Sequence, residues 1–248
     1  MDFYKIKISN SPNWQRFHAT TLGISVSSPN WQEEKFEAIL NFAARNFQTI
    51  RLDVTDALYR HNHMAEGKKP EEALALANAE GALWLTRHQD IINACPIKPQ
   101  VVRWAEWYSR PDYKDVLAGF QRAHEIDAGF REAIDRDANK FYQRKMIVPS
   151  LMELEHARNY LIEEVAVMTL QARELPSLKL YPGSELSCLK IVRNGKVPSA
   201  PKGLEREQFA RVKFETNYSL SPTYDQRSSS NGGENKNYSA VGPLTHHM

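Results

Sequence analysis

The stretch that decides the fold class is RFHATTLGISVSSPNWQEEKFEAILNFAARNFQTIRLDV, residues 16–54. Its first ten residues, up to Ser25, are rich in apolar and β-branched types and lead into the turn-forming S-S-P-N, which indicates a strand followed by a loop. Its last eight residues, 47–54, alternate apolar and polar side chains, as a second strand does. Between them lies an apolar stripe with the i, i+3, i+4, i+7 spacing of an amphipathic helix, formed by Phe36, Ile39, Leu40 and Ala43. The opening of the chain therefore predicts a β-α-β unit.

The rest of the chain continues this alternation of helices and strands. Residues 71–93 are rich in Ala and Leu and predict a helix, and residues 112–144 predict one long helix or two. Ser150 and Glu153 form the capping box of a further helix that reaches about Arg173. Further short strands are expected at 101–104, 177–181 and 186–193. Strands that alternate with helices favour an α/β fold with a parallel sheet.

The composition is that of an ordinary globular protein rather than of a disordered or fibrous chain. The 248 residues carry 32 basic and 30 acidic side chains, so the formal net charge is +2. A charge this close to zero gives no global basic field, and a nucleic-acid partner would need a local basic patch. After about Tyr218 the sequence turns to Ser, Asn, Gly, Pro and Thr. We therefore expect a single domain over residues 1–217 and a flexible tail over residues 218–248.

Several classes of protein are disfavoured by what the sequence lacks. No basic segment precedes a long apolar one at the N-terminus and no window approaches 18 apolar residues, so we expect a cytoplasmic protein without a membrane span. Cys95 and Cys188 lie far apart, which supports neither a disulfide framework nor a cysteine zinc site. His61 and His63 lack a recognisable third ligand, and we expect no metal. Phosphate-loop and dinucleotide fingerprints are missing too.

Polar residues at the ends of the predicted strands mark a candidate site. Open parallel sheets bind ligands outside the carboxyl ends of their strands, and Ser25, Asp53 and Tyr181 all lie at such ends. We expect them to converge on one crevice. Ser25 stands in G-I-S-V-S-S-P, which is not the G-x-S-x-G turn of hydrolases and is ambiguous by itself.

The helix after Ser150 adds a tyrosine and a carboxylate to this crevice. Tyr160 and Glu164 lie one turn apart beside the buried stripe of the helix, whereas Glu163 is expected on its exposed side. A carboxylate on an apolar face needs a partner or a purpose, because a desolvated charge is costly. An ion pair between Glu164 and a nearby arginine is the simpler interpretation, and catalysis is the alternative.

Taken in order through residues 17–193, these segments resemble the tRNA-dependent cyclodipeptide synthases. The G-I-S that ends at Ser25 is similar to the nucleophile motif of that family, and D-V-T-D-A-L-Y-R-H-N is similar to the segment after its second strand. N-Y-L-I-E-E is similar to its Tyr-x-x-x-Glu motif, and L-Y-P-G to its second tyrosine. Tyr181 followed by Pro182, with Ser28 three residues after Ser25, looks like the X-Tyr-Pro subfamily.

The resemblance implies a Rossmann-like parallel sheet flanked by helices, similar to the catalytic domain of class I tyrosyl- and tryptophanyl-tRNA synthetases but without their ATP site. It implies an aminoacyltransferase of secondary metabolism that joins two aminoacyl-tRNAs into a cyclic dipeptide, a diketopiperazine. The implied route is ping-pong through an aminoacyl ester on Ser25, with no ATP and no cofactor. Glu164 and Tyr160 would hold the α-amino group of the substrate, and Tyr181 would relay a proton. We expect a monomer.

Further residues are expected to bind the substrate, and they are Gly23, Ser28, Asp53, Arg87, Arg144 and Lys145. Many members of the family carry a strongly basic helix after the second strand for tRNA. Here residues 71–93 offer Arg87 against four acidic side chains. We therefore expect Arg144 and Lys145 to contact the tRNA phosphates more strongly than Arg87.

Two other functions stay open at this point, a non-catalytic tRNA- or nucleotide-binding module and a serine hydrolase of small esters. A pure binding module would have no need of Ser25, Tyr160, Glu164 and Tyr181 together. A hydrolase would need a His-Asp pair behind its serine, and none is evident. The amino acids that are joined cannot be read from the sequence, because their pockets form only in the fold.

Overall fold

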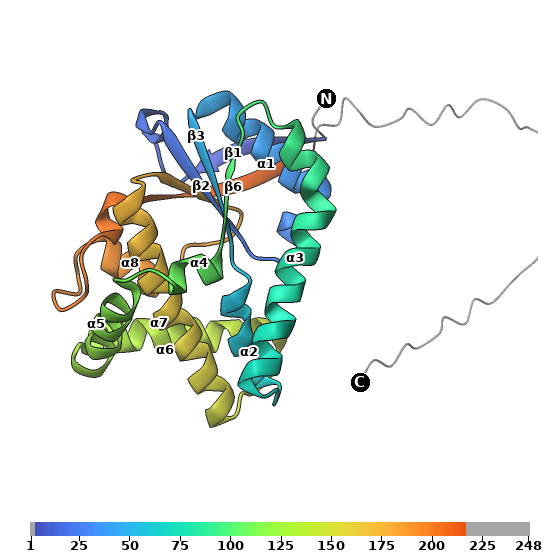
Figure 1. Cartoon of the computed structure of the whole chain (residues 1–248). Coiled ribbons are helices and arrows are strands. Elements are labelled where there is room, and N and C mark those ends of the chain that lie inside the picture. Colours follow the sequence, from blue (N-terminus) through green and yellow to red (C-terminus); the bar gives the residue numbers. More distant parts are fainter. Residues whose placement is uncertain (1–2, 217–248) are drawn as a thin grey trace, which may run out of the picture. The chain divides into compact units, whose positions relative to one another are not determined.

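The computed structural model describes residues 3–216, which contain one six-stranded sheet flanked by helices (Figure 1). The strands are β1 (Tyr4–Ser9), β2 (Ala19–Ile24), β3 (Thr49–Val54), β4 (Gln100–Arg103), β5 (Leu178–Tyr181) and β6 (Gln208–Thr216). Their order across the sheet is β1-β6-β5-β2-β3-β4. From β6 to β4 neighbouring strands are parallel, and β1 pairs with β6 in the antiparallel sense. The predicted parallel α/β sheet is thus confirmed, with an antiparallel strand added at one edge.

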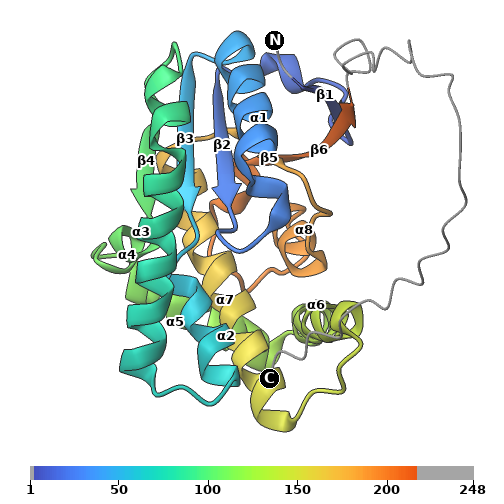
Figure 2. The ribbon, with the colours of Figure 1, turned by 90° about the vertical axis from the view of Figure 1, so that its right-hand side faces the viewer.

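The helices lie on both faces of this sheet and beyond its strand ends. They are α1 (Glu33–Asn46), α2 (Arg60–Ala65), α3 (Pro70–Ala94), α4 (Trp104–Tyr108), α5 (Tyr113–Ile126), α6 (Ala128–Lys145), α7 (Leu151–Glu174) and α8 (Ser187–Arg193). Figure 2 shows α1 and α3 in front of β2 and β3, with α2, α5 and α6 beyond the strand ends to which the arrows point. The long α7 runs from that end of the molecule to the back of the sheet.

Local sequence explains where the main helices begin. Ser150 and Glu153 cap α7 as predicted: the Ser150 hydroxyl accepts a hydrogen bond from the Glu153 amide at 3.2 Å, and the Glu153 carboxylate accepts one from the Ser150 amide at 2.7 Å. The region 112–144 is two helices, because Asp127 has extended backbone and its carboxylate caps the second by accepting from the Phe130 amide at 2.9 Å. In α1 the predicted apolar stripe is fully buried.

Residues 186–193 were expected to form a strand, and this prediction is wrong. They form the short helix α8, whose Cys188, Leu189 and Val192 face the core. Periodicity cannot separate a short apolar run in a strand from one in a helix, and here packing against α6 decides. The edge strand β1 and its neighbour β6 were not predicted, since they pair residues about two hundred positions apart.

The predicted tail, residues 218–248, lies outside the described residues, so the division at residue 217 stays a prediction. Within residues 3–216, no helix is both long enough and apolar enough to cross a membrane.

Side chains of the central strands alternate between an apolar and a polar face of the sheet. Leu22 and Leu52 point to one side and join an apolar core with α1 and α3. Arg51, Asp53 and Lys179 point to the other side, toward α7, and are buried there. Successive residues of a strand face opposite ways, so this alternation follows from the pattern of the strands themselves. The polar face leads directly to the pocket described below.

Candidate active site

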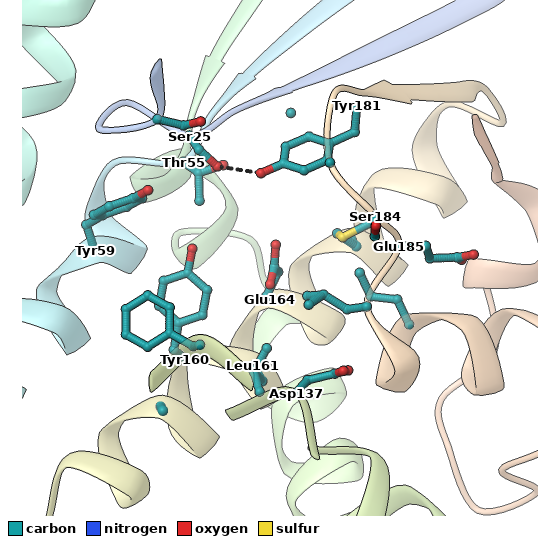
Figure 3. A pocket seen from close by; sticks show the side chains of 18 of the residues that line it. Ser25, Thr55, Tyr59, Asp137, Tyr160, Leu161, Glu164, Tyr181, Ser184 and Glu185 are labelled. Carbon is teal, nitrogen blue, oxygen red and sulfur yellow. Dashed lines mark hydrogen bonds between the residues drawn. The ribbon is translucent and has the colours of Figure 1, made fainter. Parts of the chain in front are cut away.

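A pocket of about 390 Å³ lies at the carboxyl ends of β2, β3 and β5. It brings together the four residues predicted to be catalytic, namely Ser25, Tyr160, Glu164 and Tyr181. In Figure 3, Tyr160 and Glu164 rise from α7, and Ser25 and Tyr181 lie opposite them at the strand ends. Residues from the ends of two strands and from one helix therefore converge on one cavity, as expected for an open parallel sheet.

Ser25 and Tyr181 form the upper side of the pocket. Ser25 follows the last residue of β2, Tyr181 ends β5, and the two strands are parallel neighbours. This geometry places the Ser25 hydroxyl 3.2 Å from the Tyr181 hydroxyl, within hydrogen-bond distance. Burial raises the pKa of Tyr181, so its phenol is neutral and can both donate and accept. Gly183 allows the chain to turn back closely, since a Cβ there would lie 2.5 Å from the Tyr181 ring.

Two tyrosines form the wall beside Ser25. Tyr160 from α7 and Tyr59 from the short turn η3 (Ala57–Tyr59) meet edge to face, with ring centroids 6.2 Å apart. The Tyr59 hydroxyl accepts a hydrogen bond from Ser27 at 2.9 Å. Burial raises the pKa of both phenols, which keeps them neutral. Tyr59 was not singled out from the sequence, although it lies in the same D-V-T-D-A-L-Y segment as Asp53.

Glu164 is half-buried in the pocket and makes no hydrogen bond or ion pair within residues 3–216. The predicted ion pair with an arginine is therefore wrong for these residues. Burial raises the pKa of Glu164 to about 7, the positive charge of Lys179 opposes this rise, and the negative charge of Asp137 adds to it. Near neutral pH the carboxylate is thus partly ionised and has an unfilled place for a cationic partner.

Glu163 was expected to face solvent, and this prediction is also wrong. Its carboxylate is buried and accepts two hydrogen bonds from Arg60, at 2.7 and 2.8 Å. Its Oε2 lies 2.6 Å from Nε2 of His61, and Tyr113 donates to it at 2.9 Å. Burial alone would raise the pKa of Glu163, but the hydrogen bond of His61 and the charge of Arg60 outweigh burial and lower it to about 2. The reason for the error is that α7 is covered on this side too, by α2 and α5.

Three of the six residues expected to bind substrate line the pocket, namely Gly23, Ser28 and Arg144. Arg144 is exposed at the end of α6, so it lies at the rim. Lys145 follows it but does not line the pocket, and its ammonium lies 4.4 Å from the centre of the Phe141 ring. The end of α6 therefore presents two cations beside the entrance.

Asp53 and Arg87 lie away from the pocket. Asp53 is fully buried between the sheet and α7, where its carboxylate contacts Nε of Arg51 at 3.2 Å. Its side chain points to the polar face of β3 and is not among the residues that line the pocket, so its contact with substrate stays a prediction. Arg87 is exposed on α3 and is not among the residues that line the pocket.

The histidines and cysteines considered as metal ligands in the sequence have other surroundings in the structure. His61 contacts Glu163, and His63 lies 3.3 Å from Glu80. Within the described part of the chain, no three His, Cys, Asp or Glu side chains are grouped so that they could hold a metal ion. Cys95 and Cys188 are both free thiols.

Three charged residues of the pocket were missed in the sequence, namely Asp137, Lys179 and Glu185. Asp137 of α6 lines it and is buried, with one carboxylate oxygen accepting from the Cys188 amide at 2.9 Å. Lys179 of β5 also lines it and is 7% exposed. A signal for Lys179 was present, because it stands two residues before Tyr181 and the period of a strand puts both on one side.

The sequence and the fold were compared with known proteins. The family described as Cyclodipeptide synthase matches residues 9–175. A solved CDPS from Fluoribacter dumoffii has a TM-score of 0.77 at 24% identity, covering 86% of this chain and 98% of that chain. A cyclodipeptide synthase from Candidatus Glomeribacter gigasporarum, bound to Phe-tRNAPhe, has a TM-score of 0.64 at 20% identity, covering 85% and 93%. No curated protein sequence matches.

A third solved structure connects the fold to the synthetases named above. It is the Mycobacterium tuberculosis protein, described as demonstrating that cyclodipeptide synthetases are related to type I tRNA synthetases, with a TM-score of 0.68 at 15% identity. It covers 86% of this chain and 94% of that chain. At these identities the solved structures show a shared fold, and the family match covers more than half of the sequence. The chain therefore belongs to the cyclodipeptide synthase family.

Proposed function

We propose that this enzyme joins two aminoacyl-tRNAs into a cyclic dipeptide through an aminoacyl ester on Ser25. One observation carries the proposal: the Ser25 hydroxyl lies 3.2 Å from the neutral phenol of Tyr181, in the same pocket as the Glu164 carboxylate, which has no ion-pair partner within residues 3–216. Acyl transfer between amino acids needs a nucleophile, a proton carrier and a place for an ammonium group. These three side chains supply one of each.

In the first step, Oγ of Ser25 attacks the ester carbonyl carbon of an aminoacyl-tRNA. A bond forms between Oγ and that carbon, and the bond from the carbon to the terminal ribose oxygen of the tRNA breaks. The proton of Ser25 ends on that ribose oxygen, and Tyr181 is placed to relay it. Glu164 and Tyr160 hold the ammonium group, and backbone amides of the loop after Ser25 are candidates for binding the oxyanion.

In the second step, the uncharged amino group of the acyl-enzyme attacks the ester carbonyl carbon of a second aminoacyl-tRNA. An amide bond forms, the bond from that carbon to the ribose oxygen breaks, and the proton lost by the nitrogen ends on this oxygen as the tRNA leaves. The dipeptide remains attached to Ser25 through its first residue. In the third step, the new free amino group attacks the ester on Ser25, which closes the ring and returns the proton to Oγ. The two esters to tRNA are already activated, so no ATP is consumed.

Ser28, three residues after Ser25, together with Tyr181 and Pro182 supports membership of the X-Tyr-Pro subfamily. Tyr181 takes its position from β5, and the turn at Pro182 and Gly183 folds back against its ring. The subfamily signature thus includes a residue within hydrogen-bond distance of the Ser25 hydroxyl.

We also infer that the tRNA end enters past Arg144. A related enzyme is bound to Phe-tRNAPhe in its structure. Exchanging both Arg144 and Lys145 for Glu should weaken synthesis at subsaturating substrate more than exchanging Arg87 for Glu, an equally exposed cation on α3. Synthesis by the wild type at subsaturating substrate should weaken as salt rises, and the loss caused by the exchange should therefore shrink. The opposite ranking would place the phosphate contacts on α3.

The covalent step can be tested by mass spectrometry of the intact protein. With one kind of aminoacyl-tRNA, the protein should gain the mass of one aminoacyl residue. Ser25→Ala should abolish both this adduct and the cyclic product, with an unchanged circular dichroism spectrum as the control. Tyr181→Phe should still form some adduct while the cyclic product falls. Cyclic dipeptide formed by Ser25→Ala at the wild-type rate would overturn the proposal.

A further inference from the structure

A buried lysine lies in the floor of the pocket. Lys179 is 7% exposed, and its ammonium donates a hydrogen bond to Oε1 of Gln171 at 3.4 Å. Within residues 3–216 it makes no ion pair. Lysine is rarely buried without a charged partner, because a desolvated ammonium is costly. The position of this charge therefore calls for an explanation.

Gly23 explains how the lysine reaches the pocket. Lys179 is opposite Thr21 in the pairing of β5 with β2, and its side chain runs along β2 over Gly23. A Cβ at position 23 would lie 2.9 Å from Cε and 3.3 Å from Nζ of Lys179. Gly23 has ordinary extended backbone, so the reason for glycine here is the space it leaves. By the period of the strand, Thr21, Gly23 and Ser25 share one side of β2, and the ammonium thus points along β2 toward the site.

The charge of Lys179 acts on two carboxylates that differ in their partners. It lowers the pKa of Asp53 on one side and that of Glu164 on the other, in both cases against the effect of burial. Asp53 already has Arg51 at 3.2 Å. Glu164 has no ion-pair partner among the described residues. The positive charge of Lys179 therefore matters more for the ionisation of Glu164 than for that of Asp53.

The other groups around Glu164 do not supply a positive charge at the floor of the pocket. Asp137 from α6 raises its pKa, and Lys179 from β5 opposes that rise. Arg144 lies at the exposed rim. Glu185, which precedes α8, also lines the pocket and is paired with Arg193. The neutral titratable groups are Tyr59 from η3, Tyr160 from α7, Tyr181 from β5 and Cys188 from α8.

We propose that Lys179 is a positioning residue, whose ammonium, lying over Gly23, keeps Glu164 ionised so that it can hold the α-ammonium group of the substrate. A cation in direct contact would occupy the carboxylate oxygens that the substrate needs. A cation at a distance favours the ionised form and leaves these oxygens free. The role of Glu164 rests on the proposed function, but the charge link between Lys179 and Glu164 does not.

The link is tested by titrating Glu164 directly in the full chain without substrate. Carboxyl resonances of protein labelled with ¹³C-glutamate are followed by NMR, and Glu164 is assigned by its loss in Glu164→Gln. Lys179→Met should raise the pKa of Glu164 by about one pH unit, while Lys179→Arg should keep it near the wild-type value. Lys190→Met, an exposed lysine on α8, serves as the matched control and should change nothing.

Gly23→Ala gives a second, independent perturbation that keeps the charge. The new methyl group would displace the end of the Lys179 side chain, so the pKa of Glu164 should rise, by less than in Lys179→Met. In the double variant, Gly23→Ala should not raise the pKa of Glu164 beyond its value in Lys179→Met, because the charge that the new methyl group would displace is no longer present. If Lys179→Met fails to fold, Gly23→Ala and Lys179→Arg decide the question alone.

The pH dependence of synthesis gives the functional readout. In Lys179→Met the acid limb of the pH–rate profile should shift to higher pH. The rate of synthesis should fall about tenfold at pH 6.5 and recover toward the wild-type rate at pH 9. An unshifted Glu164 titration in folded Lys179→Met and Gly23→Ala would overturn the proposal. A shifted titration in a chain that makes no cyclic dipeptide would reject the proposed function and leave the charge link standing.

Discussion

Glu163 and Glu164 are neighbours on α7, yet the two sides of the helix on which they lie offer opposite environments. Glu163 meets Arg60 and His61 from α2 and Tyr113 from α5, all between 2.6 and 2.9 Å away. Glu164 faces the pocket with no ion-pair partner among the described residues. Both carboxylates are withdrawn from water. What separates them is whether the fold itself supplies the opposite charge.

This difference indicates that Glu163 stabilises the fold, whereas Glu164 is available to a ligand. The partners of Glu163 lower its pKa to about 2, so it is ionised at any working pH. Burial raises the pKa of Glu164 to about 7, so its charge responds to the arrival of a cation. A carboxylate withdrawn from water without an ion-pair partner among the described residues, such as Glu164, lowers the stability of the fold and is retained for its chemistry.

The largest effect should come from neutralising the pocket carboxylate. Glu164→Gln keeps the shape but removes the charge that faces the substrate ammonium, and hydrogen bonds to charged groups contribute up to about 3 kcal/mol. Formation of cyclic dipeptide, measured by liquid chromatography and mass spectrometry, should fall about 100-fold. The melting temperature should not fall. A variant that retains more than a tenth of the wild-type rate would remove Glu164 from the site.

Neutralising the paired carboxylate should instead damage the fold. Glu163→Gln leaves Arg60 partly buried without its counter-charge, and breaking such a pair costs about 3 kcal/mol in the free energy of unfolding. Urea unfolding at pH 7 measures this loss. The rate per folded molecule should stay within tenfold of the wild type. A loss of stability below about 1 kcal/mol would mean that Glu163 is not needed by the fold.

The smallest effect concerns how stability depends on pH, and it has opposite signs for the two residues. The pKa of Glu163 is lowered from its usual 4.5, so its contribution is present above pH 4.5 and is lost as pH falls toward 2. The pKa of Glu164 is raised from 4.5 to about 7, so the folded state binds its proton more tightly and stability falls as pH rises through that window.

Glu164→Gln removes this second dependence. The variant should therefore be more stable than the wild type at pH 8, by about 1–3 kcal/mol, and the difference should vanish at pH 4.5. Free energies of unfolding in urea at the two pH values check this. A difference that does not change with pH would show that Glu164 has an ordinary pKa.

The sequence alone determined the strands β2, β3, β4 and β5 and which residues stand at the ends of β2 and β5. Alternation in residues 47–54, the apolar stripe of α1 and the capping box at Ser150 are local patterns, and local patterns fix local structure. The rule that ligands bind at the carboxyl ends of parallel strands then grouped Ser25 with Tyr181. Helical spacing added Tyr160 and Glu164.

What only the tertiary structure decided was the environment of each charge. Spacing along α7 suggested an exposed Glu163 and a paired Glu164, and the fold reverses both, because the partners of a buried charge come from α2, α5 and β5 rather than from its own helix. Asp53 is buried beside Arg51 of its own strand and is acted on by the charge of Lys179 from the neighbouring part of the sheet. A sequence gives the order of side chains along each element, but the pKa of a buried group depends on charges that other elements bring within a few ångströms.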